Sequence, residues 1–429
     1  MSLKSLLAPH VSQFLTSPDR LARRRDRTEK KRQRAAAPHC LYYFHDACDP
    51  YSHLMVQMLP RLSAAYEVEI ECHLVSPPPD WAAPDRVRLD TYARTDAERL
   101  AHNAGLSFAD PGNQPSDAAI SAAEQSFAEL IESGEFISDA FRISQRLWRG
   151  DEISSRGNSQ GNMDLKSNGD ELRQKLGHYL GGTVFYGGEW YWGPDRLHHL
   201  EHRLTDLGAR KSNAVTGWLY TQPDCPASIT QTGEAASEVH FYMSFRSPYT
   251  YIAAERIKAL ADAYGAELSL RFVLPMVMRG LPVPAAKRRY ILQDATREAR
   301  RTGVPFGRIN DPLGKPVERG YSLLPWAINA GRGFEYSLSF MRAVWSEGID
   351  AGSNKGLRQI VERAELDWAS ARQLIGNDDW RAEAEANRQE MMDLGLWGVP
   401  SFRVGNTATW GQDRLWVVEK ALQNGVGCS

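Results

Sequence analysis

The sequence predicts an α/β protein in which one supersecondary unit is used twice. Its 429 residues exceed the roughly 100–200 residues of a typical single domain. A shift of 198 residues superimposes two long stretches without a gap, and near the end of each stretch the shift becomes 218. The recurring pairs are Pro50 and Pro248, Tyr51 and Tyr249, Tyr66 and Tyr264, Asp96 and Asp294, Gly105 and Gly303, Trp192 and Trp410, and Asp195 and Asp413.

Each copy opens with the pattern of a βαβ unit. A short apolar run, 41–44 in the first copy and 239–243 in the second, suits a buried strand. A helix follows, with apolar residues spaced by three and four, and then a second strand at 69–75 or 267–273. Strands joined by a crossover helix pair in parallel.

Each copy then runs through a long helical middle and closes with a hairpin and a helix. In the second copy the hairpin strands are 401–404 and 407–410, and the last helix covers 413–422. This is the order of a thioredoxin fold with a helical insertion. The predicted domains are a basic N-terminal arm (1–38), a first thioredoxin-like domain (39–204), a linker (205–237) and a second thioredoxin-like domain (238–424).

Composition limits the partners and the compartment. With 51 Lys+Arg against 53 Asp+Glu, nothing in the overall charge favours nucleic acid or a membrane. The one strong local bias is basic, between Arg20 and Arg34, and predicts a solvated, partly helical arm. No signal peptide or membrane span is predicted, and the cytoplasm is expected. The five cysteines (Cys40, Cys48, Cys72, Cys225 and Cys428) form no C-x-x-C pair and suit reduced thiols.

The main candidate site follows the first strand of the second copy. Ser247 and Pro248 are a favourable N-cap and first helical residue, which is a sufficient structural reason for their presence. A helix N-terminus also stabilises a thiolate through its amide groups and dipole. Both interpretations can hold together.

Two further motifs lie near the end of the second copy. Val399 and Pro400 precede the hairpin, in the loop that faces the first helix of a thioredoxin fold. Asp413, after Gln412, is predicted to open the last helix, where an N-cap role alone would explain it.

The second copy resembles the 2-hydroxychromene-2-carboxylate isomerases and the related kappa-class glutathione transferases, of the DsbA-like thioredoxin superfamily. The similarity runs in order through residues 238–424. It is carried by 241–251, Lys287 to Tyr290, Gly303-Val304-Pro305, 343–349, Gly398-Val399-Pro400 and Trp410 to Leu415.

The resemblance implies a glutathione cofactor and a small aromatic or conjugated organic acid as substrate. Ser247 would be catalytic and would hydrogen-bond the glutathione sulfur. The backbone of Val399, before a cis Pro400, would pair with the peptide, and Gln412 and Asp413 would hold its γ-glutamyl end. Lys287 would contact the acidic end of substrate or cofactor. No metal is expected.

The sequence departs from the family after the second strand, where an Asn is usual. Here Gly280 is followed by Leu281, and Arg279 is the candidate replacement contact for an anion. The first copy departs further, because Asp49 stands in place of Ser247 and Gly182 in place of Pro400. It is predicted to be a degenerate domain that packs against, shields or mimics the partner subunit of a dimeric relative. Its Cys48 is either a semi-buried structural residue or a reactive thiol.

Two alternative functions remain open at this point. A DsbA-type thiol oxidoreductase shares the fold but needs two thiols, and Ser247 and Thr250 occupy those positions. A non-catalytic tandem binding protein would have two decayed sites. Intact Ser247 and Pro400 favour the glutathione-dependent isomerase or transferase.

Overall fold

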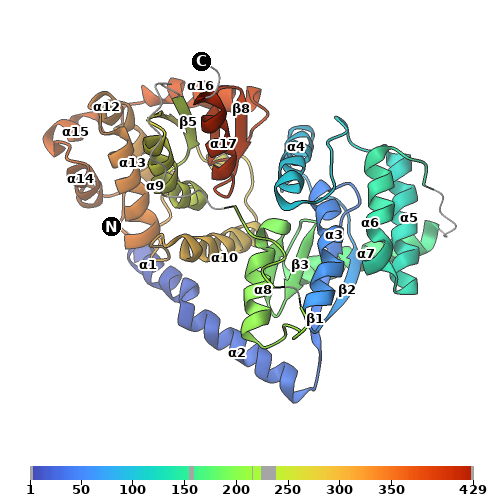
Figure 1. Cartoon of the computed structure of the whole chain (residues 1–429). Helices are drawn as coiled ribbons and strands as arrows, with labels where there is room; N and C mark the ends of the chain where they lie inside the picture. Colours follow the sequence, from blue (N-terminus) through green and yellow to red (C-terminus); the bar gives the residue numbers. More distant parts are fainter. Residues whose placement is uncertain (1–2, 154–158, 215, 224–237, 427–429) are drawn as a thin grey trace. The chain divides into compact units, whose positions relative to one another are not determined.

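The structure, a computed structural model, describes residues 3–153, 159–214, 216–223 and 238–426 (Figure 1). The chain divides into two compact units: unit 1 comprises 1–22, 223–283 and 291–429, and unit 2 comprises 23–222 and 284–290. Part of the predicted linker, 224–237, lies outside the described residues. Across the described part of the chain, no helix has both the length and the apolar character needed to cross a membrane.

Unit 2 is built on a four-stranded mixed sheet. Its strands are β1 (His39–His45), β2 (Val68–Leu74), β3 (Thr183–Tyr186) and β4 (Glu189–Trp192), in the order β2-β1-β3-β4. Strand β1 pairs in parallel with β2 and antiparallel with β3, which pairs antiparallel with β4. Helix α3 (Pro50–Ala65) is the crossover between the two parallel strands, as the βαβ pattern predicts.

Unit 1 contains a second sheet with the same order and directions. Its strands are β5 (Glu238–Met243), β6 (Glu267–Phe272), β7 (Ser401–Val404) and β8 (Thr407–Trp410), in the order β6-β5-β7-β8. Helix α9 (Pro248–Ala263) is its crossover. The predicted strands and crossover helices of both copies are therefore confirmed.

Individual hydrogen bonds also recur between the two halves. The Val75 amide donates to the His45 carbonyl, and the Val273 amide to the Met243 carbonyl, both at 2.9 Å. Near the hairpins the Gly193 amide donates to Gly182 and the Gly411 amide to Pro400, again both at 2.9 Å. The residues paired by the shifts of 198 and 218 thus make the same backbone hydrogen bonds at these positions.

Helices fill the rest of each half. The segment between β2 and β3 forms α4 (Arg86–Ala104), α5 (Asp117–Ser133), α6 (Phe136–Arg149) and α7 (Ser159–Leu176). After β4 come the short helix η1 (Pro194–Arg196) and α8 (Leu197–Asp206). Between β6 and β7 lie η2 (Met276–Arg279), α10 (Ala285–Thr302), α11 (Lys315–Tyr321), α12 (Leu324–Asn329), α13 (Gly333–Arg342), the π-helical turn η3 (Ala343–Glu347), α14 (Asn354–Arg363), α15 (Trp368–Leu374) and α16 (Trp380–Asp393).

The chain ends differ in part from the prediction. The N-terminal arm forms α1 (Leu3–Thr16) and α2 (Pro18–Arg34), and no residue of α2 is buried. The last helix, α17 (Leu415–Val426), begins at Leu415, so Asp413 lies in the preceding turn. The prediction that Asp413 opens this helix was therefore wrong by two residues, because residues 411–413 form a turn in which the Arg414 amide donates to the Gly411 carbonyl.

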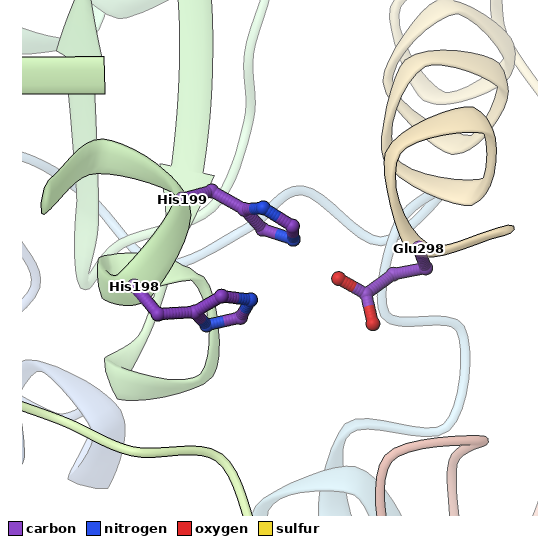
Figure 2. Close-up of side chains that lie close together, drawn as sticks. All are labelled: His198, His199 and Glu298. Carbon is purple, nitrogen blue, oxygen red and sulfur yellow. The ribbon is translucent and has the colours of Figure 1, made fainter. Parts of the chain in front are cut away.

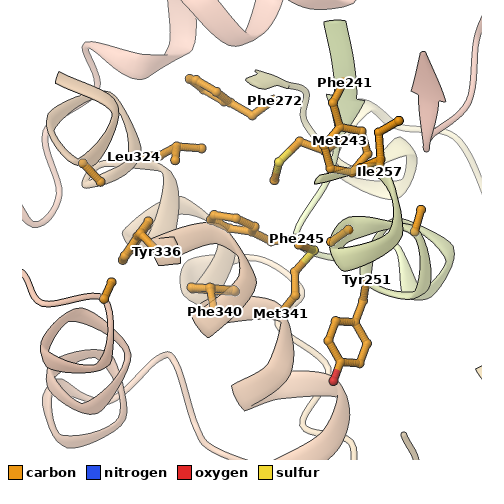
Figure 3. Close-up of a cluster of buried hydrophobic side chains, with 14 of the residues drawn as sticks. Phe241, Met243, Phe245, Tyr251, Ile257, Phe272, Leu324, Tyr336, Phe340 and Met341 are labelled. Carbon is orange, nitrogen blue, oxygen red and sulfur yellow. The ribbon is translucent and has the colours of Figure 1, made fainter. Parts of the chain in front are cut away.

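The core of unit 1 fixes α9 and the end of β5, where Ser247 follows. Phe241 and Met243 of β5 and Ile257 of α9 are buried beside Phe245 (Figure 3). Aromatic rings join the helical insertion to this core: Phe245 stacks on Phe340 with ring centroids 4.2 Å apart. The segment that carries Ser247 is thus anchored on both sides by fully buried residues.

Candidate functional site

Ser247 caps the first helix of the second half. Its backbone is extended (φ −96°, ψ 115°), Pro248 is the first helical residue, and the Ser247 Oγ accepts a hydrogen bond from the Thr250 amide at 3.1 Å. The same hydroxyl donates to the Val399 carbonyl at 3.1 Å. Ser247 is half-buried. It therefore joins the positive end of the α9 dipole to the loop before β7, as the sequence predicts.

The loop before β7 is tightly packed. The Val399–Pro400 peptide bond is cis. The Ser401 hydroxyl donates to the Gly398 carbonyl at 2.7 Å, and a Cβ at Gly398 would lie 2.4 Å from the Trp410 ring. Only glycine fits there, because real Cβ atoms do not approach other heavy atoms so closely. This packing holds the Val399 carbonyl against Ser247.

The Gln412 side chain is already bonded at both ends. It is 1% exposed, and its Nε2 donates to Glu298 Oε2 at 2.9 Å while its Oε1 accepts from Arg256 at 2.9 Å. Arg256 also donates to the Gln412 carbonyl at 3.1 Å. Gln412 thus fixes the turn that carries Asp413. Asp413 is half-buried, with one carboxylate oxygen 3.4 Å from the Arg414 guanidinium.

A tyrosine on the first turn of α9 pairs with an aspartate on α10, and this pair was not identified as a site feature from the sequence. The Tyr249 hydroxyl donates to Asp294 Oδ2 at 2.9 Å, and Asp294 is 1% exposed. In the first half, Tyr51 donates to the equivalent Asp96 at 2.8 Å. The recurrence of both residues at the shift of 198 was the signal that could have revealed this contact.

The two predicted anion contacts fall in different units. Arg279, in unit 1, ends η2, and burial lowers the pKa of its guanidinium, with Arg388 acting in the same direction. The Arg279 Nε is buried and has no hydrogen-bond partner among the described residues. Lys287 belongs to unit 2, where burial lowers its pKa and its Nζ donates to the Ala82 carbonyl at 3.5 Å. The structure therefore groups Ser247, Val399, Pro400, Gln412, Asp413 and Arg279 in one unit and leaves Lys287 in the other.

In the first half, the residue at the position of Ser247 is Asp49, whose carboxylate is occupied by local hydrogen bonds. Asp49 caps α3, accepting from the Tyr51 and Ser52 amides at 3.2 and 3.0 Å and from the Ser52 hydroxyl at 2.9 Å. Burial and the nearby Asp46 carboxylate raise the pKa of Asp49, and burial raises that of Asp46. A Cβ at Gly182 would lie 2.9 Å from Asp49 Oδ2. Asp49 therefore fills the space next to Gly182.

Among the described residues, the hydrogen-bond partner of the Cys48 thiol is a carboxylate, which does not activate a thiol. Its Sγ donates to Asp46 Oδ1 at 3.1 Å, and its amide donates to the same oxygen. Burial, and then the Asp46 carboxylate, raise the pKa of the Cys48 thiol well above its usual range. Thiolates, not thiols, are the nucleophiles. The geometry thus favours the structural interpretation of Cys48, and its reactivity stays a prediction.

Three further titratable side chains are drawn in Figure 2. His198 and His199 are neighbours at the start of α8 in unit 2, with ring centroids 3.9 Å apart. Glu298, on α10, belongs to unit 1, where it bonds Gln412 and Arg301. Within its unit, Glu298 supports the turn before α17.

Comparison with protein families identifies residues 238–423 as a DsbA-like thioredoxin domain. Two similar proteins are both named 2-hydroxychromene-2-carboxylate isomerase. The one from Pseudomonas putida is 24% identical over 194 residues, covering 43% of this chain and 93% of that protein. The one from Sphingobium xenophagum is 26% identical over 196 residues, covering 43% of this chain and 97% of that protein. The second half thus corresponds to almost the whole of each relative.

Solved structures give a similar picture. A 2-hydroxychromene-2-carboxylate isomerase structure is 22% identical, covers 44% of this chain and 95% of that chain, and has a TM-score of 0.38. The cytosolic disulfide reductase DsbM from Pseudomonas aeruginosa, solved with GSH, is 20% identical, covers 44% of this chain and 96% of that chain, and has a TM-score of 0.34. The isomerase relatives and the matched domain support an enzyme of the DsbA-like family.

Proposed function

We propose that the second half is a glutathione-dependent isomerase or transferase that acts on a small aromatic or conjugated organic acid. The observation that supports this most directly is the position of the Ser247 hydroxyl, which caps α9 and faces the loop of Val399. The isomerase relatives add support because the second half matches almost their whole length. A reducing compartment follows from the cofactor and from the scattered cysteines, so we place the protein in the cytoplasm.

The residues around Ser247 fit a thiol cofactor. A serine hydroxyl has one proton to donate and can still accept a bond. Here the hydroxyl accepts a hydrogen bond from the Thr250 amide and donates one to the Val399 carbonyl. A bound thiolate would accept the hydrogen bond that the hydroxyl now donates to Val399. The α9 dipole favours negative charge at the same place. When bound, glutathione would supply a sulfur nucleophile that adds to a conjugated double bond, permits rotation and leaves again.

The other residues of unit 1 would orient cofactor and substrate. The Val399 backbone would pair with the peptide of glutathione. Asp413 would accept from its γ-glutamyl ammonium group, while Gln412, whose amide already bonds Glu298 and Arg256, would keep the turn in place. The buried Arg279 Nε offers a donor for a carboxylate. Lys287 remains a proposed substrate contact.

A glutathione titration with a rate measurement tests the proposal. Calorimetry should detect binding to wild type and to Asp49→Ala, the matched change in the first half. Loss of a hydrogen bond to a charged partner costs about 1.5–3 kcal/mol, so Ser247→Ala should lower a thiol-addition rate roughly ten- to hundredfold while the fold survives. Absence of glutathione binding by the wild type would instead support a non-catalytic binding protein.

A further inference from the structure

Helix α1 is attached to unit 1 through its polar face. The Ser12 hydroxyl accepts from the Ile309 amide at 2.8 Å, and the Thr16 hydroxyl donates to the Gly307 carbonyl at 3.3 Å. Arg300 also donates to the Thr16 carbonyl. A Cβ at Gly307 would lie 2.4 Å from Thr16 Oγ1, so a glycine makes room for the helix. Helix α1 is therefore a docked element of unit 1.

The apolar face of α1 points away from these contacts. Nine large apolar side chains are exposed in the described part of the chain, and five of them lie in this one helix: Leu6 (51%), Leu7 (54%), Val11 (55%), Phe14 (59%) and Leu15 (49%). Leu7, Val11 and Phe14 are spaced by four and three residues, which places them on one side of the helix. We call these five residues the apolar stripe. A surface helix normally buries its apolar face and exposes its polar face, whereas α1 does the reverse.

Positive charge follows the apolar stripe along the chain. The Arg20 guanidinium lies 4.5 Å from the centre of the Phe14 ring. Helix α2 then carries Arg23, Arg27, Lys30, Lys31 and Arg34, all exposed. Two acidic residues among them, Asp19 and Asp26, are also exposed, but the cations are in excess. An apolar stripe that is followed in the sequence by exposed cations combines the two contributions that hold a helix on the surface of an anionic membrane, namely apolar burial and attraction to acidic headgroups.

We propose that the apolar stripe is a docking surface for an anionic lipid bilayer, and that the basic segment which follows it in the sequence, 20–34, adds electrostatic attraction. The apolar side chains would enter the boundary between headgroups and acyl chains, and the Lys and Arg side chains would be drawn to acidic headgroups. The chain would lie on the membrane without crossing it. This surface is independent of the Ser247 site.

A second copy of the chain fits the apolar stripe less well than a bilayer does. Two copies joined through α1 would each carry a basic segment that begins within a few residues of the contact, and like charges repel. Anionic lipid neutralises the same charges. The apolar stripe also spans few turns, and the electrostatic contribution of several Lys and Arg residues supplements its limited apolar area.

Vesicle co-sedimentation of the full chain tests the proposal. We expect binding to phosphatidylcholine vesicles with roughly a third phosphatidylserine, little binding to pure phosphatidylcholine, and weakening by salt. The double variant Leu7→Gln, Phe14→Gln should bind at least about tenfold more weakly, because it removes the largest apolar groups of the stripe. The triple variant Arg27→Gln, Lys31→Gln, Arg34→Gln should also bind more weakly and lose most of the salt dependence.

The matched control changes exposed apolar residues elsewhere. Val87→Gln with Met163→Gln alters side chains that are 79% and 66% exposed, and should bind like wild type. Equal binding to neutral and anionic vesicles, or stripe variants that bind like wild type, would overturn the proposal. Sedimentation velocity measures the oligomeric state of wild type and of Phe14→Gln. If the wild type is a dimer that Phe14→Gln converts to a monomer, the apolar stripe is a contact between copies and the membrane proposal is wrong.

Discussion

The same backbone position carries opposite chemistry in the two halves of this chain. Ser247 and Asp49 both cap the crossover helix of a four-stranded sheet with the same strand order. The Ser247 hydroxyl reaches the neighbouring loop and bonds the Val399 carbonyl. Asp49 uses its carboxylate on Ser52 and on the helix amides, and a carboxylate there would repel a thiolate.

The residue that lies against the N-cap of the crossover helix also differs between the two halves. Asp49 lies against Gly182, where a Cβ would come within 2.9 Å of its carboxylate, whereas Ser247 lies near Pro400. The larger acid is thus combined with the residue that lacks a side chain, and the smaller serine with a proline. The first site is therefore a packed structural turn, in which Asp49 and Gly182 depend on each other.

The side chains on one face of the sheet also differ between the two sheets. In unit 2, Phe44 of β1 and Trp190 of β4 pack in an apolar cluster with Tyr290 of α10. In the second half, His240 of β5 lies between charged groups: its Nε2 is 2.8 Å from Arg403 and 3.0 Å from Glu238. Shared strand order therefore does not require shared side-chain chemistry.

The largest expected effect comes from filling the space at Gly182. Gly182→Ala should lower the free energy of unfolding by about 2–3 kcal/mol, because it adds a close contact with Asp49 to the strain of a positive φ of 61°. Gly188→Ala is the control, since that glycine has a φ of 84° but no atom within 4 Å of its added Cβ. Urea unfolding should show the smaller loss for Gly188→Ala. Equal losses would remove the argument that Asp49 and Gly182 depend on each other.

The paired tyrosines should show a smaller, equal effect on stability. Tyr51→Phe and Tyr249→Phe each leave a buried carboxylate, Asp96 or Asp294, with one hydrogen bond fewer. Each should cost about 1–2 kcal/mol in thermal or urea unfolding. A loss in only one half would show that the recurring pair is not equivalent in the two halves.

The smallest expected effect is a pH dependence confined to the first half. The pKa of Asp49 is raised in the folded state, so its favourable contribution is complete below the ordinary carboxyl pKa of about 4 and is lost as the pH rises. Asp49→Asn keeps a capping oxygen and should gain about 1 kcal/mol over wild type at pH 8 relative to pH 4. Ser247→Ala, which removes no titrating group, should show no such trend. A constant difference between wild type and Asp49→Asn across this range would contradict the raised pKa.

Much of the fold follows from local patterns in the sequence. The apolar runs at 41–44 and 239–243 and the helical spacing after them determine the βαβ units, because these patterns depend only on neighbouring residues. Ser247 and Pro248 likewise predict the start of α9 from local preferences. The start of α17 was misplaced, since an acceptable N-cap at Asp413 does not by itself end the preceding turn.

Contacts between distant residues could not be predicted in the same way. The bonds of Gln412 to Glu298 and Arg256 join segments more than a hundred residues apart, and no local pattern reports them. The inward polar face of α1 was also missed, because Ser12 and Thr16 find their partners around Gly307 and Ile309 only in the folded unit. Tertiary contacts thus decide which polar residues are available to a ligand.

We propose that Ser247, and not the first half, stabilises a thiolate. The most direct measurement is the ultraviolet absorbance of bound glutathione thiolate against pH in wild type, Ser247→Ala, Asp49→Ala and Cys48→Ala. We expect a thiol pKa below the ~8.5 of a free cysteine in wild type, in Asp49→Ala and in Cys48→Ala, and a return toward that value in Ser247→Ala. If Ser247→Ala titrates like wild type while Asp49→Ala or Cys48→Ala abolishes the signal, the site lies in the other half of the chain.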